Sequence, residues 1–428
     1  MSRYVEGARR IVEHVAERLA ADLSVQLWNG EVLPLGPGAS SDIRILIQSP
    51  QVIARLLRSP SLLTLVEEHI TGGLQILGGS PLEAASRWDH MRALVLRRTV
   101  QQRVLLSAAL PFLFLRESKD QRLTFPQRVR RRFGRGRDDQ VMVGFHYDVS
   151  NDFYALFLDP EMQYSPGYFE DIHTSLADAQ FAKLDRICRK LDLGPEDRLL
   201  DIGCGWGGMA CHAARHYGTK VHGVTLSKEQ LAFAEAKVRN LGLSELVTLE
   251  LRDFRSLDVA GAYTKVVQVG MFEHVGLDNH DSYFGHVHHL TVEGGLYLHD
   301  AITRRAPKDL KRFRDPTPYM RFINRYIFPG GELDYLGLTM TNLERNGFEV
   351  RDVESMREHY HLALKHWAEN LYARREEAEE LVGPERFRLW LLYLSMCAVG
   401  FWRGAIYDFQ TLARKRSTGL AGLRVGRA

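Results

Sequence analysis

The chain has 428 residues, which is long enough for two or three domains of ordinary size. Hydrophobic residues make up 45% and charged residues 25% of it, a globular balance that excludes a disordered, collagen-like or disulfide-dense protein. The four cysteines lie far apart without a CxxC pair: Cys188, Cys204, Cys211 and Cys397. We therefore expect no structural zinc, no disulfides and a reducing compartment.

The N-terminal sequence carries charges from Arg3 onward and lacks the apolar core of a secretory signal. The longest uncharged apolar stretch runs from Val104 to Leu115 and contains Ser107 and Pro111. This stretch is too short to span a bilayer. We therefore expect a soluble chain that at most lies on a membrane surface.

The net charge of +3 conceals a strongly basic segment. Between Met91 and Arg137 the sequence has 13 lysine and arginine residues but only two acids. Such a segment is either a solvated linker or a site that attracts polyanions. Because the apolar stretch VLLSAALPFLFL lies immediately upstream, an anionic membrane surface is favoured over nucleic acid as the partner. The residues expected to face the membrane are Arg128, Arg130, Arg131 and Arg132.

Three parts are predicted along the chain. Residues 1–90 are expected to form a small α/β domain, with a helix over 9–19 and strands over 23–28 and 43–48. Residues 91–140 are expected to form the basic helical connector. In 141–428, amphipathic helices alternate with apolar runs at 198–202, 220–227, 246–253, 264–270 and 294–302. This alternation predicts a doubly wound, mostly parallel sheet that binds ligands at the carboxyl ends of its strands.

A glycine-rich loop, DIGCGWGG, occupies residues 201–208 after the first of these strands. Glycines between a strand and a helix let the backbone pass close to a ligand. The spacing also satisfies the dinucleotide pattern GxGxxG, but NAD is disfavoured because no acid follows the second strand, near Leu226. Asp201 precedes the loop instead and suits a ligand with an ammonium group, such as S-adenosylmethionine (SAM).

Five segments resemble the cyclopropane fatty acid synthase family, in order and at the family's spacing. They are HYDVSNDFY…DPEMQYS (146–165), LDIGCGWGGMA (200–210), GVTLSKEQ (223–230), VGMFEHVG (269–276) and NRYIFPGG (324–331). The resemblance implies a class I methyltransferase fold and SAM-dependent modification of unsaturated phospholipid acyl chains. It also implies a cytoplasmic enzyme associated peripherally with the inner face of the membrane. The oligomeric state is open, with a homodimer as one option.

The resemblance also implies which residues bind SAM. Tyr164 and Ser165 would touch its methionine part, beside Asp201 from the argument above, and Gly203, Gly205 and Gly207 would form the loop beneath it. Thr225, Ser227 and Gln230 would hold the ribose, and Asp253 and Phe254 would flank the adenine. A simpler interpretation of Thr225 and Ser227 is that they cap the helix beginning at Lys228. Both roles can coexist.

Methyl transfer to an alkene leaves a cation on the chain, which needs a pocket free of water. Aromatic residues near the motifs could line such a pocket or belong to the core: Tyr168, Phe169, Phe272, Tyr326, Phe328 and Trp402. The resemblance implies that a bound bicarbonate then removes a proton, held by Glu273, His299, Tyr360 and two backbone N–H groups. His299 could instead be a satisfied polar group at a strand end.

Two positions depart from the family pattern: Pro166 replaces a cysteine and Ala301 replaces an isoleucine. Proline has no N–H group, so one backbone donor to bicarbonate would be lost, which weakens binding by roughly 1.5–3 kcal/mol. The sequence favours cyclopropane formation slightly, because the three side chains are present. The alternative is C-methylation without ring closure, giving a methyl-branched chain or a methylated alkene. An inactive methyltransferase domain that only binds membranes is disfavoured, and no metal is expected.

Overall fold

The structure is a computed structural model that describes residues 2–88, 107–115, 149–309 and 313–418. Contacts divide the chain into two compact units, which we call the four-strand unit and the seven-strand unit. The four-strand unit contains residues 1–127, 316–322 and 368–399, and the seven-strand unit contains 128–315, 323–367 and 400–428. The connector expected at 91–140 lies almost entirely outside the described residues, so the predicted boundaries stay predictions.

The four-strand unit is built around a small mixed sheet with the order β2-β1-β3-β4. Its elements are α1 (Ser2–Leu19), β1 (Ser24–Gln26), β2 (Val32–Pro34), β3 (Arg44–Ile47), α2 (Pro50–Arg58), α3 (Leu62–Ile70), β4 (Leu74–Leu77), α4 (Pro81–Ser86) and the short 3-10 helix η1 (Leu110–Phe112). The core joins Ala8 and Val12 of α1 to Val25, Ile47 and Phe112. The predicted helix over 9–19 and the two predicted strands all fall on observed elements.

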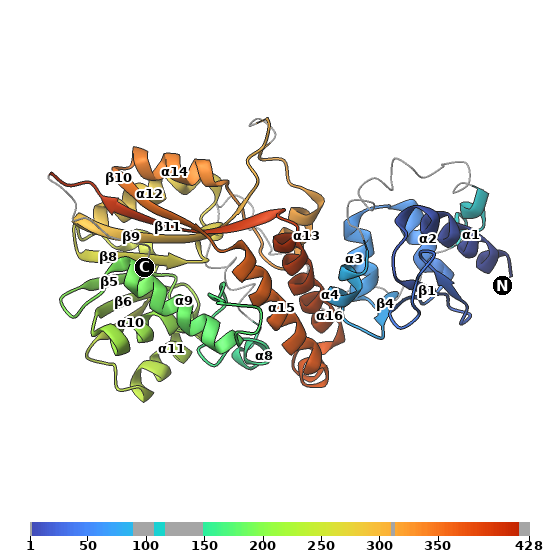
Figure 1. The fold of residues 1–428 in the computed structure, drawn as a ribbon, viewed down its shortest axis with the longest axis horizontal. Coiled ribbons are helices and arrows are strands. Elements are labelled where there is room, and N and C mark those ends of the chain that lie inside the picture. Colours follow the sequence, from blue (N-terminus) through green and yellow to red (C-terminus); the bar gives the residue numbers. More distant parts are fainter. Residues whose placement is uncertain (1, 89–106, 116–148, 310–312, 419–428) are drawn as a thin grey trace. The chain divides into compact units, whose positions relative to one another are not determined.

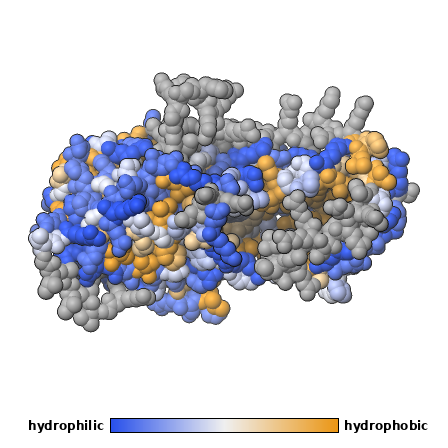
Figure 2. Space-filling model, turned by 90° about the horizontal axis from the view of Figure 1, so that it is seen from above, coloured by the Kyte–Doolittle hydropathy of each residue, from blue (hydrophilic) through white to orange (hydrophobic). Residues whose placement is uncertain are grey.

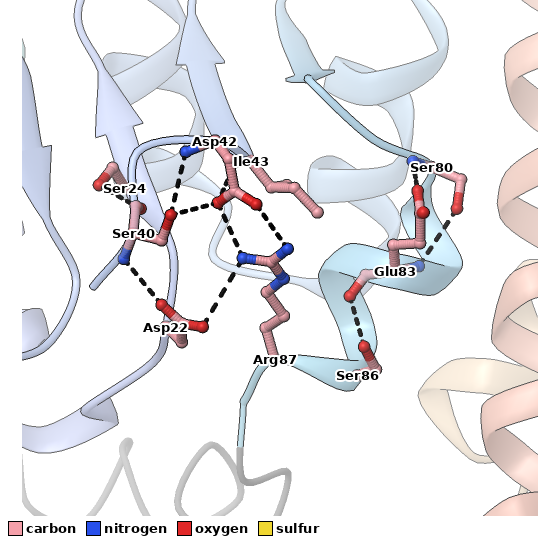
Figure 3. A network of polar contacts seen from close by, with 9 residues as sticks. All are labelled: Asp22, Ser24, Ser40, Asp42, Ile43, Ser80, Glu83, Ser86 and Arg87. Atoms are coloured by element: carbon pink, nitrogen blue, oxygen red, sulfur yellow. Dashed lines mark hydrogen bonds and ion pairs between the residues drawn. The ribbon is translucent and has the colours of Figure 1, made fainter. Parts of the chain in front are cut away.

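A polar network fixes the end of α4 against the loop before β3 (Figure 3). The Arg87 guanidinium donates to both carboxylate oxygens of Asp42, at 2.8 and 2.6 Å. At the other end of α4, Ser80 and Glu83 form a reciprocal capping box, which satisfies two N–H groups at the start of the helix. These contacts hold α4 in place from both ends.

The seven-strand unit has the sheet order β10-β11-β9-β8-β5-β6-β7 (Figure 1). Its strands are β5 (Arg198–Ile202), β6 (Lys220–Thr225), β7 (Val247–Leu251), β8 (Tyr263–Val269), β9 (Thr291–Arg304), β10 (Phe348–Ser355) and β11 (Ile406–Lys415). The five strands from β7 to β9 run parallel, and β11 pairs antiparallel with both β9 and β10. The predicted α/β class with a mostly parallel sheet is confirmed.

Helices cover both faces of this sheet (Figure 1). One face packs on α9 (Leu176–Leu191), α10 (Gly208–Tyr217) and α11 (Lys228–Asn240), and the other packs on α12 (His280–Leu290) and α14 (Leu336–Arg345). Successive side chains of β9 point to opposite faces, as strand geometry requires. Leu298 therefore joins the α9 side, whereas Tyr297 joins the α12 side.

The described residues also form the helices α8 (Asn151–Ala155), α13 (Pro318–Tyr326), α15 (Arg357–Ala373) and α16 (Arg375–Trp402). The backbone of α16 is interrupted at Gly383, which has a φ of 79° and precedes Pro384. The four cysteines are buried and not paired in disulfides. In the part of the chain that the structure describes, no helix has the length and apolar character needed to cross a bilayer.

Candidate active site

The glycine loop turns the chain from β5 into α10 with three residues in the left-handed region. Gly203, Gly205 and Gly207 have φ values of 80°, 52° and 79°, which residues with a side chain rarely adopt. A Cβ atom added at Gly205 would meet only the Gln230 amide nitrogen, at 3.9 Å. A Cβ atom at Gly207 would lie 3.0 Å from the Cβ atom of Ala234. Gly205 therefore keeps space open for a ligand, whereas Gly207 permits close packing against α11.

A cavity of about 360 Å³ lies where β5, β6 and β8 end. Nine of the eleven predicted cofactor residues line it: Tyr164, Ser165, Asp201, Gly203, Gly205, Thr225, Gln230, Asp253 and Phe254. The other two, Gly207 and Ser227, are absent from the lining. Ser227 accepts a hydrogen bond from the Gln230 N–H at 3.3 Å and so caps α11. Residues that are distant in sequence thus meet at one cavity, as expected for the carboxyl ends of parallel strands.

Asp201 places an unsatisfied carboxylate at this cavity. The side chain is 3% exposed, and its Oδ2 atom has no hydrogen-bond partner among the described residues. Burial raises the pKa of Asp201 to about 7, while the nearby Lys183 ammonium opposes this rise. A buried carboxylate oxygen that lines a cavity is stabilised by a donor from a ligand. The ammonium group of SAM provides such a donor, so the residues present fit this cofactor.

The loop before α9 lines part of the cavity and is held by hydrogen bonds to Asp159. The Asp159 carboxylate accepts hydrogen bonds from the backbone N–H groups of Glu161 and Gln163, at 2.9 and 2.8 Å. These bonds fix the turn that presents Tyr164 and Ser165. The Tyr164 ring lies 5.2 Å from the Trp367 ring of α15, centroid to centroid.

The cavity lining also contains the two residues expected at the adenine, Asp253 and Phe254. Asp253 caps the short 3-10 helix η2 (Phe254–Ser256) by accepting the Arg255 N–H at 2.9 Å. The Phe254 ring packs edge-on against Tyr283 and His286, with centroid distances of 5.2 and 5.9 Å. This part of the lining therefore combines aromatic rings with polar groups, which is a suitable surface for a purine.

Glu273 lies on the 3-10 helix η3 (Phe272–His274), directly after β8. Its Oε1 atom accepts the backbone N–H of Ile302 at 2.6 Å, whereas Oε2 has no partner among the described residues. Burial raises the pKa of Glu273 to about 7, and the Ile302 hydrogen bond opposes this rise. The carboxyl group can therefore exchange a proton near neutral pH.

His299 lies on β9 and faces the α12 side of the sheet. The Gln268 amide donates to its Nδ1 atom at 2.9 Å, so the ring proton of neutral His299 resides on Nε2. The ring remains neutral because burial lowers its pKa to about 3, with a further contribution from His280. Nε2 has no hydrogen-bond partner within the described ranges. It is therefore a buried donor available to a bound group.

Tyr360 lies on α15 and stacks on Phe401, with ring centroids 4.4 Å apart. It also contacts Trp367 edge-on at 6.2 Å, and Trp367 in turn contacts Tyr164 at the cavity. Glu273, His299 and Tyr360 are not part of the cavity lining, and the contacts described above place each among different neighbours. Their joint action on one bound anion stays a prediction.

The two departures from the family pattern lie at buried positions. Ala301 packs in the core on the α12 side, and it is the next residue, Ile302, whose N–H donates to Glu273. Pro166 is also buried and follows Ser165, whose carbonyl accepts the Gln180 amide at 2.8 Å.

Comparison with known proteins agrees with this geometry. Residues 135–411 match the family described as mycolic acid cyclopropane synthetase. The chain belongs to this family. A probable fatty acid methyltransferase of Pseudomonas putida is 40% identical over 403 residues, which are 93% of each chain. The cyclopropane-fatty-acyl-phospholipid synthase of Escherichia coli is 37% identical over 66% of this chain and 69% of its own length.

Solved structures of the family have the same fold. The mycolic acid cyclopropane synthase CmaA1, complexed with SAH and CTAB, is 34% identical with a TM-score of 0.61 over 65% of this chain and 99% of its own. The cyclopropane synthase MmaA2 of Mycobacterium tuberculosis is 32% identical, with a TM-score of 0.60. The resemblance noted in the sequence and the class I methyltransferase fold are therefore confirmed. The protein is a SAM-dependent methyltransferase of the cyclopropane synthase family.

Several cavity residues of this family member were missed by the sequence analysis. They are Gln163, Lys183, Arg252, His274 and His286, and they come from five separate segments. Gln163 and His274 lie within two of the segments that resemble the family, and Lys183 has a local signal of its own. It lies four residues after Ala179 and four before Ile187, both fully buried on α9. A lysine on the apolar face of a helix is unusual and indicates a buried partner.

Proposed function

We propose that this enzyme transfers a methyl or methylene group from SAM to a double bond of an unsaturated fatty acyl chain in a membrane phospholipid. The single observation that best supports this proposal is the unsatisfied Asp201 carboxylate beside the glycine loop, at a cavity large enough for part of a nucleoside cofactor. The acyl substrate is inferred from the names of the relatives in P. putida and E. coli.

SAM, when bound, supplies an activated methyl group. The residues of this chain must then align the alkene, exclude water and accept the proton that the acyl chain loses. Phe272 is fully buried and packs edge-on against His299, with ring centroids 4.6 Å apart, which keeps water from this region. Glu273 is the candidate proton acceptor, since its pKa of about 7 leaves a substantial ionised fraction at neutral pH.

Bicarbonate is a further proposal that two observations support. His299 Nε2 carries a buried N–H group without a partner, and Glu273 Oε2 is a buried oxygen without a partner, in the chain as described. Bicarbonate both accepts and donates hydrogen bonds, so it could satisfy both groups. Tyr360 is the third side chain proposed to hold it. In this scheme bicarbonate, rather than Glu273 itself, takes the proton.

A second candidate product is a methylated chain without a ring. Pro166 cannot donate a backbone hydrogen bond to an anion, which would weaken the proposed bicarbonate site. The relative matched over 93% of both chains is named a fatty acid methyltransferase, whereas the E. coli cyclopropane synthase matches over 66% of this chain. Both observations favour a route in which the proton leaves from a neighbouring carbon of the acyl chain, so that no ring closes. We retain ring closure as the first candidate because Glu273, His299 and Tyr360 are all present.

We also propose a cytoplasmic enzyme that lies on the inner, anionic face of the membrane. Around η1, the exposed fractions of Leu110, Leu113 and Phe114 are 58%, 44% and 89%. Figure 2 shows hydrophobic area on the surface of the four-strand unit. Arg128, Arg130, Arg131 and Arg132 follow in the sequence but lie outside the described residues, so their contact with lipid stays a prediction. The homodimer option also stays a prediction.

The substrate class is tested by measuring release of S-adenosylhomocysteine (SAH) from SAM in the presence of phospholipid vesicles. Vesicles with unsaturated acyl chains should support steady release of SAH. Vesicles with the same headgroups and only saturated chains should not, because they offer no double bond. Equal release with both vesicle types would overturn the proposed substrate.

A further inference from the structure

Lys183 is a buried cation at the cofactor cavity. It lies on α9 and is 1% exposed. Its Nζ atom donates to Gln163 Oε1 at 2.8 Å and to Ser165 Oγ at 3.0 Å, and all three residues line the cavity. A lysine ammonium has three donors. Two are used within the protein, which leaves one for a further acceptor.

The charges around Lys183 come from four other segments. The negative charges that favour its charged form are those of Asp300 on β9, Asp159 in the loop before α9, Asp201 on β5 and Asp408 on β11. Burial nevertheless lowers the pKa of Lys183 to about 8, so the ammonium is still protonated at neutral pH. Of these four acids, only Asp201 lines the cavity.

Each of the other three acids has at least one partner, and although Asp300 Oδ1 and Asp408 Oδ2 have none among the described residues, neither residue lines the cavity. Asp159 accepts the two backbone N–H groups described above, and Asp300 accepts the Gln410 amide at 2.9 Å. Asp408 forms a hydrogen bond with Asp300, which together with burial and the neighbouring acids raises the pKa of Asp408 well above its usual value. Among the described residues that line the cavity, Lys183 therefore supplies one ammonium and Asp201 one carboxylate oxygen without a partner. An α-amino acid zwitterion carries the complementary pair of charges.

We propose that Lys183 binds the α-carboxylate of the methionine moiety of SAM, while Asp201 binds its α-ammonium. Through its bonds to Gln163 and Ser165, Lys183 also positions the loop before α9. This assignment rests on the proposed use of SAM and extends it to a residue outside the recognisable motifs. Recognition of the amino-acid end is therefore shared between α9 and the end of β5.

The test compares two ligands that differ only in the amino-acid moiety. SAH has it, whereas methylthioadenosine keeps the adenosine and the sulfur but lacks it. Calorimetry of Lys183→Met should show binding of SAH weakened by roughly 10- to 100-fold, as for a lost charge-assisted hydrogen bond, with little change for methylthioadenosine. Lys190→Met is the matched control. Lys190 is 4% exposed on the same helix but contacts Gln410 and Glu354 instead.

A pH series separates a direct role from a structural one. SAH binding should weaken below about pH 7 as Asp201 gains a proton. The Lys183 charge lowers the pKa of Asp201, so Lys183→Met should move this loss to higher pH, whereas Lys190→Met should not. If Lys183→Met does not fold, Lys183→Gln should give the same pattern.

Equal weakening of both ligands in a folded variant, or an unchanged affinity for SAH, would overturn the role of Lys183. Failure of the wild-type protein to bind either ligand would instead overturn the use of SAM. Loss of SAH binding with methylthioadenosine binding retained supports the assignment.

Discussion

Single glycines shape the cofactor cavity, and Gly205 gives the clearest prediction. Its φ of 52° is unfavourable for a β-branched residue, and a side chain there would project into space that the protein leaves open. Gly205→Val should therefore abolish SAH binding measured by calorimetry. Gly194→Val is the control, because an added Cβ atom there meets nothing within 4 Å and Gly194 is outside the cavity lining. Full SAH affinity in Gly205→Val would contradict the placement of the cofactor.

Glu273 provides a second prediction, this time for turnover. Because it is not part of the cavity lining, Glu273→Gln should leave the KM for SAM nearly unchanged. Loss of the ionisable group should lower kcat by roughly a hundredfold to ten-thousandfold, as for a removed general base or the ligand of one.

The matched control for Glu273→Gln is Asp334→Asn. Asp334 is also buried, its pKa is likewise raised to about 7, and its carboxylate accepts the Thr339 hydroxyl. Steady-state kinetics of the two variants should differ clearly in kcat. If both variants lose activity equally, Glu273 has no special part in proton transfer.

For single residues, the sequence predicts the glycine loop and its acid but misses other residues of the cavity lining. Gly205 and Asp201 are recognisable because a turn between a strand and a helix requires glycine at fixed positions and places the acid beside it. Lys183 belongs to no such motif, and its importance depends on contacts with Gln163 and Ser165. Its only local signal is its place on the buried face of α9.

Among the elements, the segment around η1 predicts a lipid contact. Phe112 is fully buried and fixes the segment, while Phe114 is 89% exposed. The Arg58 guanidinium donates to the backbone carbonyls of Leu113 and Leu115, which holds the segment in place. Burying a phenylalanine side chain in the bilayer interface contributes about 1.5–3 kcal/mol, so Phe114→Ser should weaken binding to anionic vesicles by roughly tenfold or more.

The control for Phe114→Ser is Leu65→Ser, since Leu65 is 48% exposed on α3 of the same unit. Replacing the four arginines from Arg128 to Arg132 with glutamine should also weaken binding, by about 1 kcal/mol per charge near an anionic surface, and added salt should act likewise. Vesicle cosedimentation measures both effects. If vesicle binding depends neither on these substitutions nor on salt, the basic segment is a solvated linker rather than a lipid contact.

The sequence predicts the parallel strands well because short segments rich in apolar residues alternate with amphipathic helices along 198–302. The sequence does not predict the strands β10 and β11, which the structure shows. In β11, the buried positions include Asp408, Gln410 and Thr411, so no apolar run marks it. These polar residues are accommodated by partners on other elements, such as Lys190 on α9, which cannot be inferred from the strand itself.

For the whole molecule, the division of the chain depends on long-range contacts. Residues 316–322 and 368–399 belong to the four-strand unit although they follow the glycine loop by more than 100 positions. From composition we expect one boundary near residue 140, with all later residues in a single domain. Local sequence patterns do not show that later segments of the chain pack back into the first unit. The family match over 135–411 includes these returning segments, so they belong to the matched region as well.

A labelling experiment shows directly whether a methyl carbon passes from SAM to an acyl-chain double bond. The protein is incubated with SAM that carries a carbon-labelled methyl group, bicarbonate and unsaturated phospholipid vesicles. Mass spectrometry then locates the label, and proton NMR identifies the product. We predict label within the unsaturated acyl chain, with upfield ring methylene protons for ring closure and ordinary methyl signals for the second candidate. Label in the headgroup, in saturated chains or in no lipid at all would contradict methyl transfer to an unsaturated acyl chain.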